Sequence, residues 1–288
     1  LLTVSEENIL LRLMVVLAFI LSASTSGTPA FSDRAPRGYQ LNETPHRHGF
    51  RYTRSGEPVR RGSVAERFEV RNGDCGGADC GAPRYRSEIR ISKSRTKARI
   101  GKDIWYGWSY YNESIPAFAN DVNLMPVVGQ WKMGGDAYPI MKLTYHGSRK
   151  TVEVQLDDIK NALGWGKAQR FGHVCSLLPL KSTKRRWTDF VVNTNFSAKS
   201  DGYLRIWVNG KLRCDYKGQL VVNKTRRLYP GPNHRRGIFV SYTKRWDTVR
   251  GSAPKPTMVV YYDEFLVGES REDVDTRLRE QMGYAPVD

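Results

Sequence analysis

Hydrophobic and polar residues alternate along most of the chain from Val64 onward. A period of two places successive side chains on opposite faces of a β-strand, so each alternating segment predicts a strand. The predicted strands are residues 67–71, 84–90, 104–111, 127–132, 140–145, 151–156, 187–196, 203–208, 237–242 and 258–267. Asn209-Gly210 follows one of these segments and favours a type I′ turn, which predicts a hairpin at that point.

The C-terminal tail alone has a helical period, because Val274, Leu278 and Met282 recur at a spacing of four residues. Ser270 can cap this helix, with Asp273 three residues further on. Many alternating strands and one short C-terminal helix predict an all-β fold, a two-sheet sandwich of the jelly-roll kind.

The N-terminal residues differ from the rest in composition. Arg12 precedes an apolar run over 13–21 and then small residues, as in a secretory signal, and the run is too short to span a bilayer comfortably. We predict a signal peptide over residues 1–30, an irregular linker rich in Pro, Gly, Arg and Ser over 31–62, and a β-sandwich domain over 63–288. We therefore expect the mature protein to be secreted or periplasmic, and not to be stably inserted in a membrane after signal removal.

Cysteine usage agrees with export. Cys75 and Cys80 enclose a short Gly-rich loop that allows them to pair, and Cys175 and Cys214 can form a second bridge. Four cysteines permit three pairings, and we favour 75–80 with 175–214. The spacing of Cys75 and Cys80 has no nearby Cys-x2-Cys or His-x3-His partner, which argues against a zinc site.

The chain carries 46 basic and 29 acidic side chains, a formal net charge of +17. Such a charge indicates a polyanionic partner, namely nucleic acid, anionic lipid or an acidic polysaccharide. Export argues against nucleic acid, so an acidic polysaccharide is the expected partner of a protein that we expect to be a monomer.

The strand predicted at 84–90 carries most of the candidate chemistry. Its alternation places Arg84, Arg86, Glu88 and Arg90 on one face, where Glu88 can lie between two guanidinium groups and fix their directions. The face then offers planar donors suited to a carboxylate or sulfate, so Arg84, Glu88 and Arg90 are candidates for substrate binding. The alternative is an exposed strand with solvated charges.

The strand predicted at 104–111 has aromatic side chains on both faces, with Tyr106, Trp108 and Tyr110 on one of them. One face is expected to pack in the core, and the other would offer a platform on which sugar rings stack. Trp108 is the candidate for substrate contact, although aromatic strands are more often plain core.

Six segments, taken together and in order, resemble the heparin lyase I-like polysaccharide lyases, which include glucuronan lyases. The segments are Asn72-Gly73-Asp74-Cys75, Arg84-Tyr85-Arg86-Ser87-Glu88, Trp105-Tyr106-Gly107-Trp108-Ser109, Gly129-Gln130-Trp131, Asp201-Gly202-Tyr203-Leu204-Arg205-Ile206-Trp207-Val208-Asn209-Gly210 and Val260-Tyr261-Tyr262-Asp263-Glu264. The resemblance implies a concanavalin-like β-jelly roll whose concave face holds an acidic polysaccharide and cleaves it by β-elimination.

In this reaction a base removes the C5 proton of a uronate and an acid protonates the departing C4 oxygen. Negative charge accumulates on the neighbouring carboxylate, so Arg and Gln side chains that bind this group lower the barrier. The resemblance implies that Arg86 and Gln130 take these carboxylate-binding positions.

The sequence also departs from the family pattern. Lys132 stands where family members usually have His, and Arg235 to Phe239 replace a Lys-x-Gly-x-Tyr segment, so Arg235 supplies a cation but Phe239 cannot transfer a proton. A desolvated Lys132 flanked by cations would have a lowered pKa and act as base. Tyr242 and His234 are the other candidates for proton transfer, and Tyr242 would need a bulge to reach the same face as Phe239.

Two functions therefore stay open: an exported lyase with a rearranged acid/base pair, and a non-catalytic binder that keeps the basic groove. The Glu-x-Asp-x-x-Glu pattern of a jelly-roll glycoside hydrolase is missing from the sequence. No cofactor is expected to be required. Asp263 or Glu264 leaves a structural Ca2+ ion open, although two acidic residues do not supply the six to eight oxygen ligands that calcium takes. Further candidates for proton transfer are Tyr203, His146 and His173.

Overall fold

Two seven-stranded antiparallel sheets pack face to face in the computed structural model, which describes residues 34–42, 46–92, 94–118, 121–134, 137–164, 167, 174–222 and 231–288. The first sheet has the order β1 (Tyr39–Asn42), β4 (Tyr85–Ile91), β13 (Asn233–Val240), β6 (Val127–Lys132), β7 (Pro139–His146), β8 (Thr151–Gln155), β9 (Val174–Pro179). The second has the order β12 (Lys211–Lys217), β11 (Tyr203–Val208), β10 (Trp187–Thr194), β5 (Ile104–Asn112), β14 (Met258–Gly268), β3 (Glu66–Val70), β2 (Phe50–Tyr52). The predicted all-β sandwich is confirmed.

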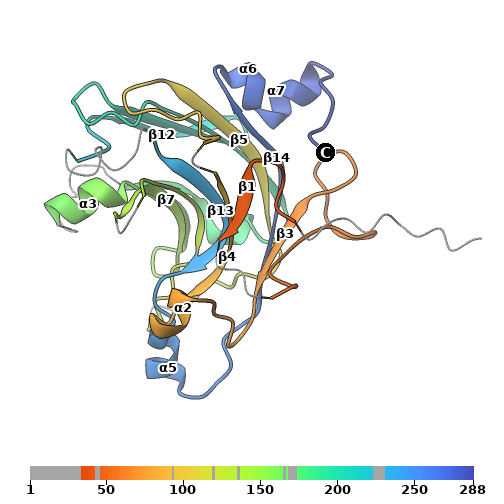
Figure 1. Ribbon diagram of the computed structural model, residues 1–288, viewed down its shortest axis with the longest axis vertical. Coiled ribbons are helices and arrows are strands. Elements are labelled where there is room, and N and C mark those ends of the chain that lie inside the picture. Colours follow the sequence, from red (N-terminus) through yellow and green to blue (C-terminus); the bar gives the residue numbers. More distant parts are fainter. Residues whose placement is uncertain are drawn as a thin grey trace, which may run out of the picture. The chain divides into compact units, whose positions relative to one another are not determined.

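Short helices lie at the margins of the sheets. α2 (Ala78–Gly81) precedes β4, α3 (Asp157–Leu163) packs beside β7, and α5 (Lys244–Arg250) follows β13 (Figure 1). A 3-10 turn spans Leu180–Ser182. In the described ranges no helix is long and apolar enough to cross a membrane.

The C-terminal helical pattern forms two helices rather than the single one expected. α6 (Arg271–Val274) begins at the predicted cap, where Ser270 and Asp273 form a reciprocal capping box. Asp275 has extended backbone and its side chain accepts from the N–H groups of the next turn, so the chain restarts as α7 (Thr276–Gln281). Asp275 therefore divides the pattern, because its carboxylate caps a new helix. Figure 1 shows α6 and α7 near β5 and β14.

The core lies between the two sheets and follows the predicted alternation. On β4, Tyr85, Ser87 and Ile89 are buried against the second sheet. Trp131 of β6 is fully enclosed and lies against the ring of Trp108 on β5. The alternate positions of the first sheet face away from the core, which leaves one complete face for polar chemistry.

Strands also form where no alternation was recognised. β1 and β2 lie within residues 31–62, the stretch predicted as an irregular linker, and β1 pairs with β4 while β2 pairs with β3. Both are short edge strands whose partners supply the backbone hydrogen bonds, so their own sequence carries little signal. The predicted signal peptide at 1–30 lies outside the described residues.

Both favoured disulfide pairings are confirmed. Cys75–Cys80 closes the loop around α2, with a Cα–Cα distance of 4.9 Å. Cys175 of β9 and Cys214 of β12 are joined with a Cα–Cα distance of 5.7 Å. These two strands are edges of different sheets, so the second bridge connects the sheets covalently at one margin of the sandwich.

We expect the two bridges to differ in their contribution to stability. A crosslink restricts the unfolded chain in proportion to the logarithm of the loop it closes, which gives about 4 kcal/mol for the 39-residue separation and about 2 kcal/mol for the separation of 5. Denaturant unfolding of Cys175→Ala/Cys214→Ala and of Cys75→Ala/Cys80→Ala measures both losses. A larger loss for the short loop would contradict this account.

Candidate active site

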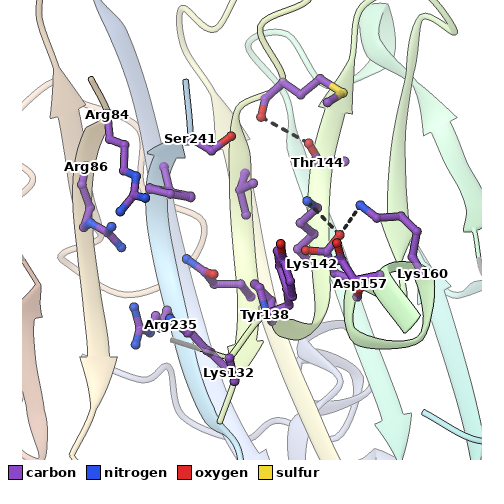
Figure 2. Close-up of a pocket in the computed structure, with 17 residues that line it drawn as sticks. Arg84, Arg86, Lys132, Tyr138, Lys142, Thr144, Asp157, Lys160, Arg235 and Ser241 are labelled. Atoms are coloured by element: carbon purple, nitrogen blue, oxygen red, sulfur yellow. Dashed lines mark hydrogen bonds and ion pairs between the residues drawn. The ribbon is translucent and has the colours of Figure 1, made fainter. Parts of the chain in front are cut away.

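A pocket of about 330 Å3 opens on the face of the first sheet that is turned away from the core. Strands β4, β13, β6 and β7 form its floor, and the start of α3 forms one wall (Figure 2). Six basic side chains and one carboxylate, Asp157, line it. The basic residues are Arg84, Arg86, Lys132, Lys142, Lys160 and Arg235. The pocket is therefore suited to an anionic ligand.

Strand register brings the main polar residues into one row across the sheet. Arg235 of β13 is the Cα partner of Gln130 on β6, and Gln130 is the partner of Lys142 on β7. The row continues from Lys142 to Gln155 on β8, and in the other direction from Arg235 to Arg90 on β4. Since neighbouring strands lie about 4.8 Å apart, the row forms a line of donors perpendicular to the strands.

A second row beside it contains the apolar part of the pocket. Arg86 of β4 pairs with Phe239 of β13, Phe239 with Val127 of β6, and Val127 with Thr144 of β7. The guanidinium of Arg86 lies 4.3 Å from the centre of the Phe239 ring. The pocket thus combines a row of charged and amide groups with an apolar surface, as ligand sites commonly do.

Two buried carboxylates hold Arg86. Its Nε and Nη2 donate to both oxygens of Asp79, at 2.7 and 3.1 Å, and its Nη1 donates to Glu88 at 3.1 Å. Asp79 and Glu88 are each only 1% exposed. The guanidinium is therefore fixed in direction, and its charge is largely offset by its own neighbours.

Glu88 also orients Gln130. The amide Nε2 of Gln130 donates to Oε1 of Glu88 at 2.5 Å, while Asn42 of β1 donates to Oε2 at 3.3 Å. The predicted role of Glu88 between two guanidinium groups holds for Arg86. Arg90 lies beside Arg235 in the ladder but outside the lining of the pocket.

At the α3 end of the pocket one carboxylate joins two lysines. Asp157 lies 3.1 Å from Nζ of Lys142, and it also pairs with Lys160. Burial lowers the pKa of Lys142, an effect that the charge of Lys160 strengthens and the charge of Asp157 opposes. Figure 2 shows this trio opposite Arg84, Arg86 and Arg235. The sequence pattern did not identify it, because Asp157 and Lys160 lie in a helix that was not predicted.

Tyr138 was also missed by the sequence analysis. It lies just before β7, lines the pocket and is 56% exposed. Its neighbour Pro139 is the Cα partner of Lys132 on β6, and Tyr138 and Lys132 both line the pocket. No alternation marks Tyr138, since it precedes its strand.

The structure removes two predicted residues from the site. Trp108 is stacked on Phe190 inside the core, so it is a core residue rather than a sugar platform. His234 is 3% exposed and its ring stacks on Phe265, 4.6 Å between centres. It lies one residue from Arg235 and therefore on the opposite face of β13. Neither side chain can touch a ligand in the pocket.

The remaining candidates lie apart from the pocket lining. Tyr242 is exposed and its ring lies beside the guanidinium of Arg245. The neighbouring residue Ser241 lines the pocket, whereas Tyr242 does not. Tyr203 of β11 lies in the second sheet and bonds to Asp103. His146 is buried at the end of β7 and accepts or donates a bond with Ser148. His173 lies outside the described residues.

The acidic residues proposed for calcium are occupied by protein groups. Asp263 accepts from the backbone N–H groups of Arg60 and Arg61, and burial raises the pKa of Asp263 to about 7. Glu264 pairs with Arg61 at 3.0 Å and accepts from the N–H of Val287. Among the residues with described positions, no group of three His, Cys, Asp or Glu side chains could hold a metal.

The fold and the pocket define a jelly-roll sandwich with a pocket lined mainly by basic side chains. A family model described as polysaccharide lyase matches residues 37–266, and the chain belongs to this family. A comparison with curated proteins found no match.

Among solved structures, the chain is similar to the endo-β-1,4-glucuronan lyase of the fungus Trichoderma reesei, with 16% identity, 85% of this chain and 97% of that chain covered, and a TM-score of 0.56. It is also similar to a double variant of the alginate lyase A1-II′, with 15% identity, 81% and 95% covered, and a TM-score of 0.50. At these identities the two likenesses show the fold.

We expect Glu88 to be more important for stability than an ordinary surface carboxylate. Glu88→Ala removes a buried acceptor shared by Arg86, Gln130 and Asn42, and breaking a buried pair costs about 3–5 kcal/mol. Glu113→Ala is the control, since its partner Arg185 is 67% exposed and such pairs contribute at most about 1 kcal/mol. Denaturant unfolding compares them, and equal losses would contradict the role of Glu88.

The core position of His234 predicts a pH dependence. Burial, together with the charge of Arg236, lowers the pKa of His234 well below its usual range, while in the unfolded chain it is about 6.5. The unfolded state therefore binds more protons below that pH, so this contribution to stability is present above about pH 6.5 and is lost as the pH falls. Each pH unit below about 6.5 lowers the free energy of unfolding by up to about 1.4 kcal/mol, until the pH reaches the pKa of His234 in the native state.

His234→Leu should flatten this part of the stability curve between about pH 6.5 and 5, because no group is left to protonate. Unfolding free energies of both proteins across this range measure the difference. Identical slopes would mean that His234 reaches solvent in the native protein.

Proposed function

We propose that this protein is a lyase that cleaves a uronate-containing polysaccharide by β-elimination. The observation that carries the proposal is the row formed by Arg235, Gln130 and Lys142 in a pocket lined by six basic side chains. Its donors are suited to the carboxylates of a polyuronate. The apolar surface of Phe239 and Val127 beside the row is suited to the face of a sugar ring.

In the proposed reaction Arg235 and Gln130 bind the carboxylate of the reacting uronate. Charge that accumulates on this group as the C5 proton leaves is then stabilised by a guanidinium and by the second N–H of an amide already fixed by Glu88. Arg86 contributes less charge than the sequence suggested, because Asp79 and Glu88 offset it. We assign Arg86 to positioning Glu88 and the floor of the pocket.

Lys132 is the proposed base. It lies on the same face of β6 as Gln130, two residues further along the strand, and it lines the pocket. A neutral amine at this position would take the C5 proton next to the carboxylate that Gln130 binds.

The competing function is a binder without activity. It is favoured by Phe239, which occupies the pocket beneath Arg86 and has no proton to exchange. The two functions differ in one product: only a lyase forms the unsaturated uronate at the new chain end, which absorbs ultraviolet light. Binding of a polysaccharide without new absorbance would favour the binder.

The test uses purified protein with glucuronan, alginate and heparin as separate substrates, because the resemblance leaves open whether a plain uronate polymer or a sulfated one is preferred. Lys132→Ala should lower kcat by about 100- to 10,000-fold and leave affinity unchanged. Arg235→Ala should lower both kcat and the affinity for the polysaccharide. Equal loss of affinity in the two variants would contradict the assigned roles.

We further propose that the protein is secreted or periplasmic and acts as a monomer. Two disulfides support export, because such bridges persist in oxidising compartments. Non-reducing electrophoresis of culture fluid and cell extract tests the location.

A further inference from the structure

We infer that Tyr138 is a catalytic residue, the acid that protonates the departing sugar oxygen. The inference rests on the proposed lyase activity and assigns the one proton-transfer step that Lys132 leaves open. Sequence patterns pointed to Tyr242 and His234 for this step, and the structure places neither in the lining of the pocket.

The composition of the pocket narrows the choice of acid. Among the described lining residues, Tyr138 supplies the one phenol. Lys142 and Lys160 are both paired with Asp157. Thr144 donates to the backbone carbonyl oxygen of Pro126 at 3.2 Å. A phenol is also a much stronger acid than the hydroxyl of Ser241 or Thr144, with an ordinary pKa of about 10.

Backbone geometry holds Tyr138 at the pocket. The residue before a proline is restricted to extended backbone conformations, so Pro139 limits the backbone conformation of Tyr138. Pro139 also begins β7 and is the Cα partner of Lys132. Figure 2 shows Tyr138 among the pocket residues, and its 56% exposure leaves the ring accessible to a ligand that enters.

The proposed step balances within the pair of residues. The neutral amine of Lys132 takes the C5 proton, and the C–H electrons form the C4–C5 double bond. The C4–O bond breaks, its electrons go to the glycosidic oxygen, and Tyr138 donates its phenolic proton to that oxygen. The ammonium of Lys132 then returns a proton to the Tyr138 phenolate, which restores both groups without a further reactant.

The main test compares Tyr138→Phe with the wild-type protein on whichever polyuronate the wild type cleaves. We expect kcat to fall by about 100-fold or more, with KM and the unfolding midpoint unchanged, because only one hydroxyl is lost. Tyr284→Phe is the matched control, an exposed tyrosine near the C-terminus, and it should keep wild-type turnover.

A second substrate separates acid catalysis from a structural effect. A uronate that carries fluoride at C4 loses a leaving group that needs no proton, so Tyr138→Phe should cleave it at nearly the wild-type rate. An equal loss on both substrates would overturn the role of Tyr138 as acid.

Other outcomes also decide the inference. Full activity of Tyr138→Phe with a raised KM in Tyr138→Ala would show that the ring only stacks on the sugar. Loss of turnover in Tyr242→Phe but not in Tyr138→Phe would transfer the role to Tyr242. Both results overturn the inference and leave the proposed lyase function intact, whereas a wild-type protein that releases no unsaturated product contradicts the lyase itself.

Discussion

The bonds around the buried carboxylate of Glu88 are the interaction on which the pocket depends. Glu88 is enclosed in the first sheet and accepts from side chains on β1, β4 and β6. A buried charge is tolerated only when it is paired and hydrogen-bonded, so the groups that donate to Glu88 have fixed directions. Arg86 and Gln130 are consequently held in place before any ligand binds, which is the preorganisation that electrostatic catalysis requires.

Antiparallel register then converts these fixed residues into a continuous site. Arg235, Gln130 and Lys142 come from three strands that are distant along the chain, and backbone pairing places them in one row. The same pairing places Phe239 and Val127 in the next row. A polysaccharide that crosses the strands would meet charged groups along one side and an apolar surface along the other.

Much of the fold could be predicted because the period of two is a local property. The alternation on β4 placed Arg86 on a face of charged side chains, the family resemblance added Gln130 of β6, and the structure brings both to the pocket. The same alternation applied to β5 did not show which face is outside, so Trp108 was assigned to the wrong side. Two faces of a strand are equivalent in sequence when both carry aromatic rings.

The sequence by itself determined the alternating strands, the short Cys75–Cys80 loop and the surplus of positive charge, because each depends on neighbouring residues or on composition, whereas the Cys175–Cys214 bridge joins strands of different sheets. Only the tertiary structure decided which charged and polar side chains come together. Asp79 offsets Arg86, Asp157 joins Lys142 to Lys160, and Tyr138 lines the same pocket as Lys132. These contacts depend on which strands pair and in which register, and that choice is made by burial of the whole sandwich rather than by any local pattern.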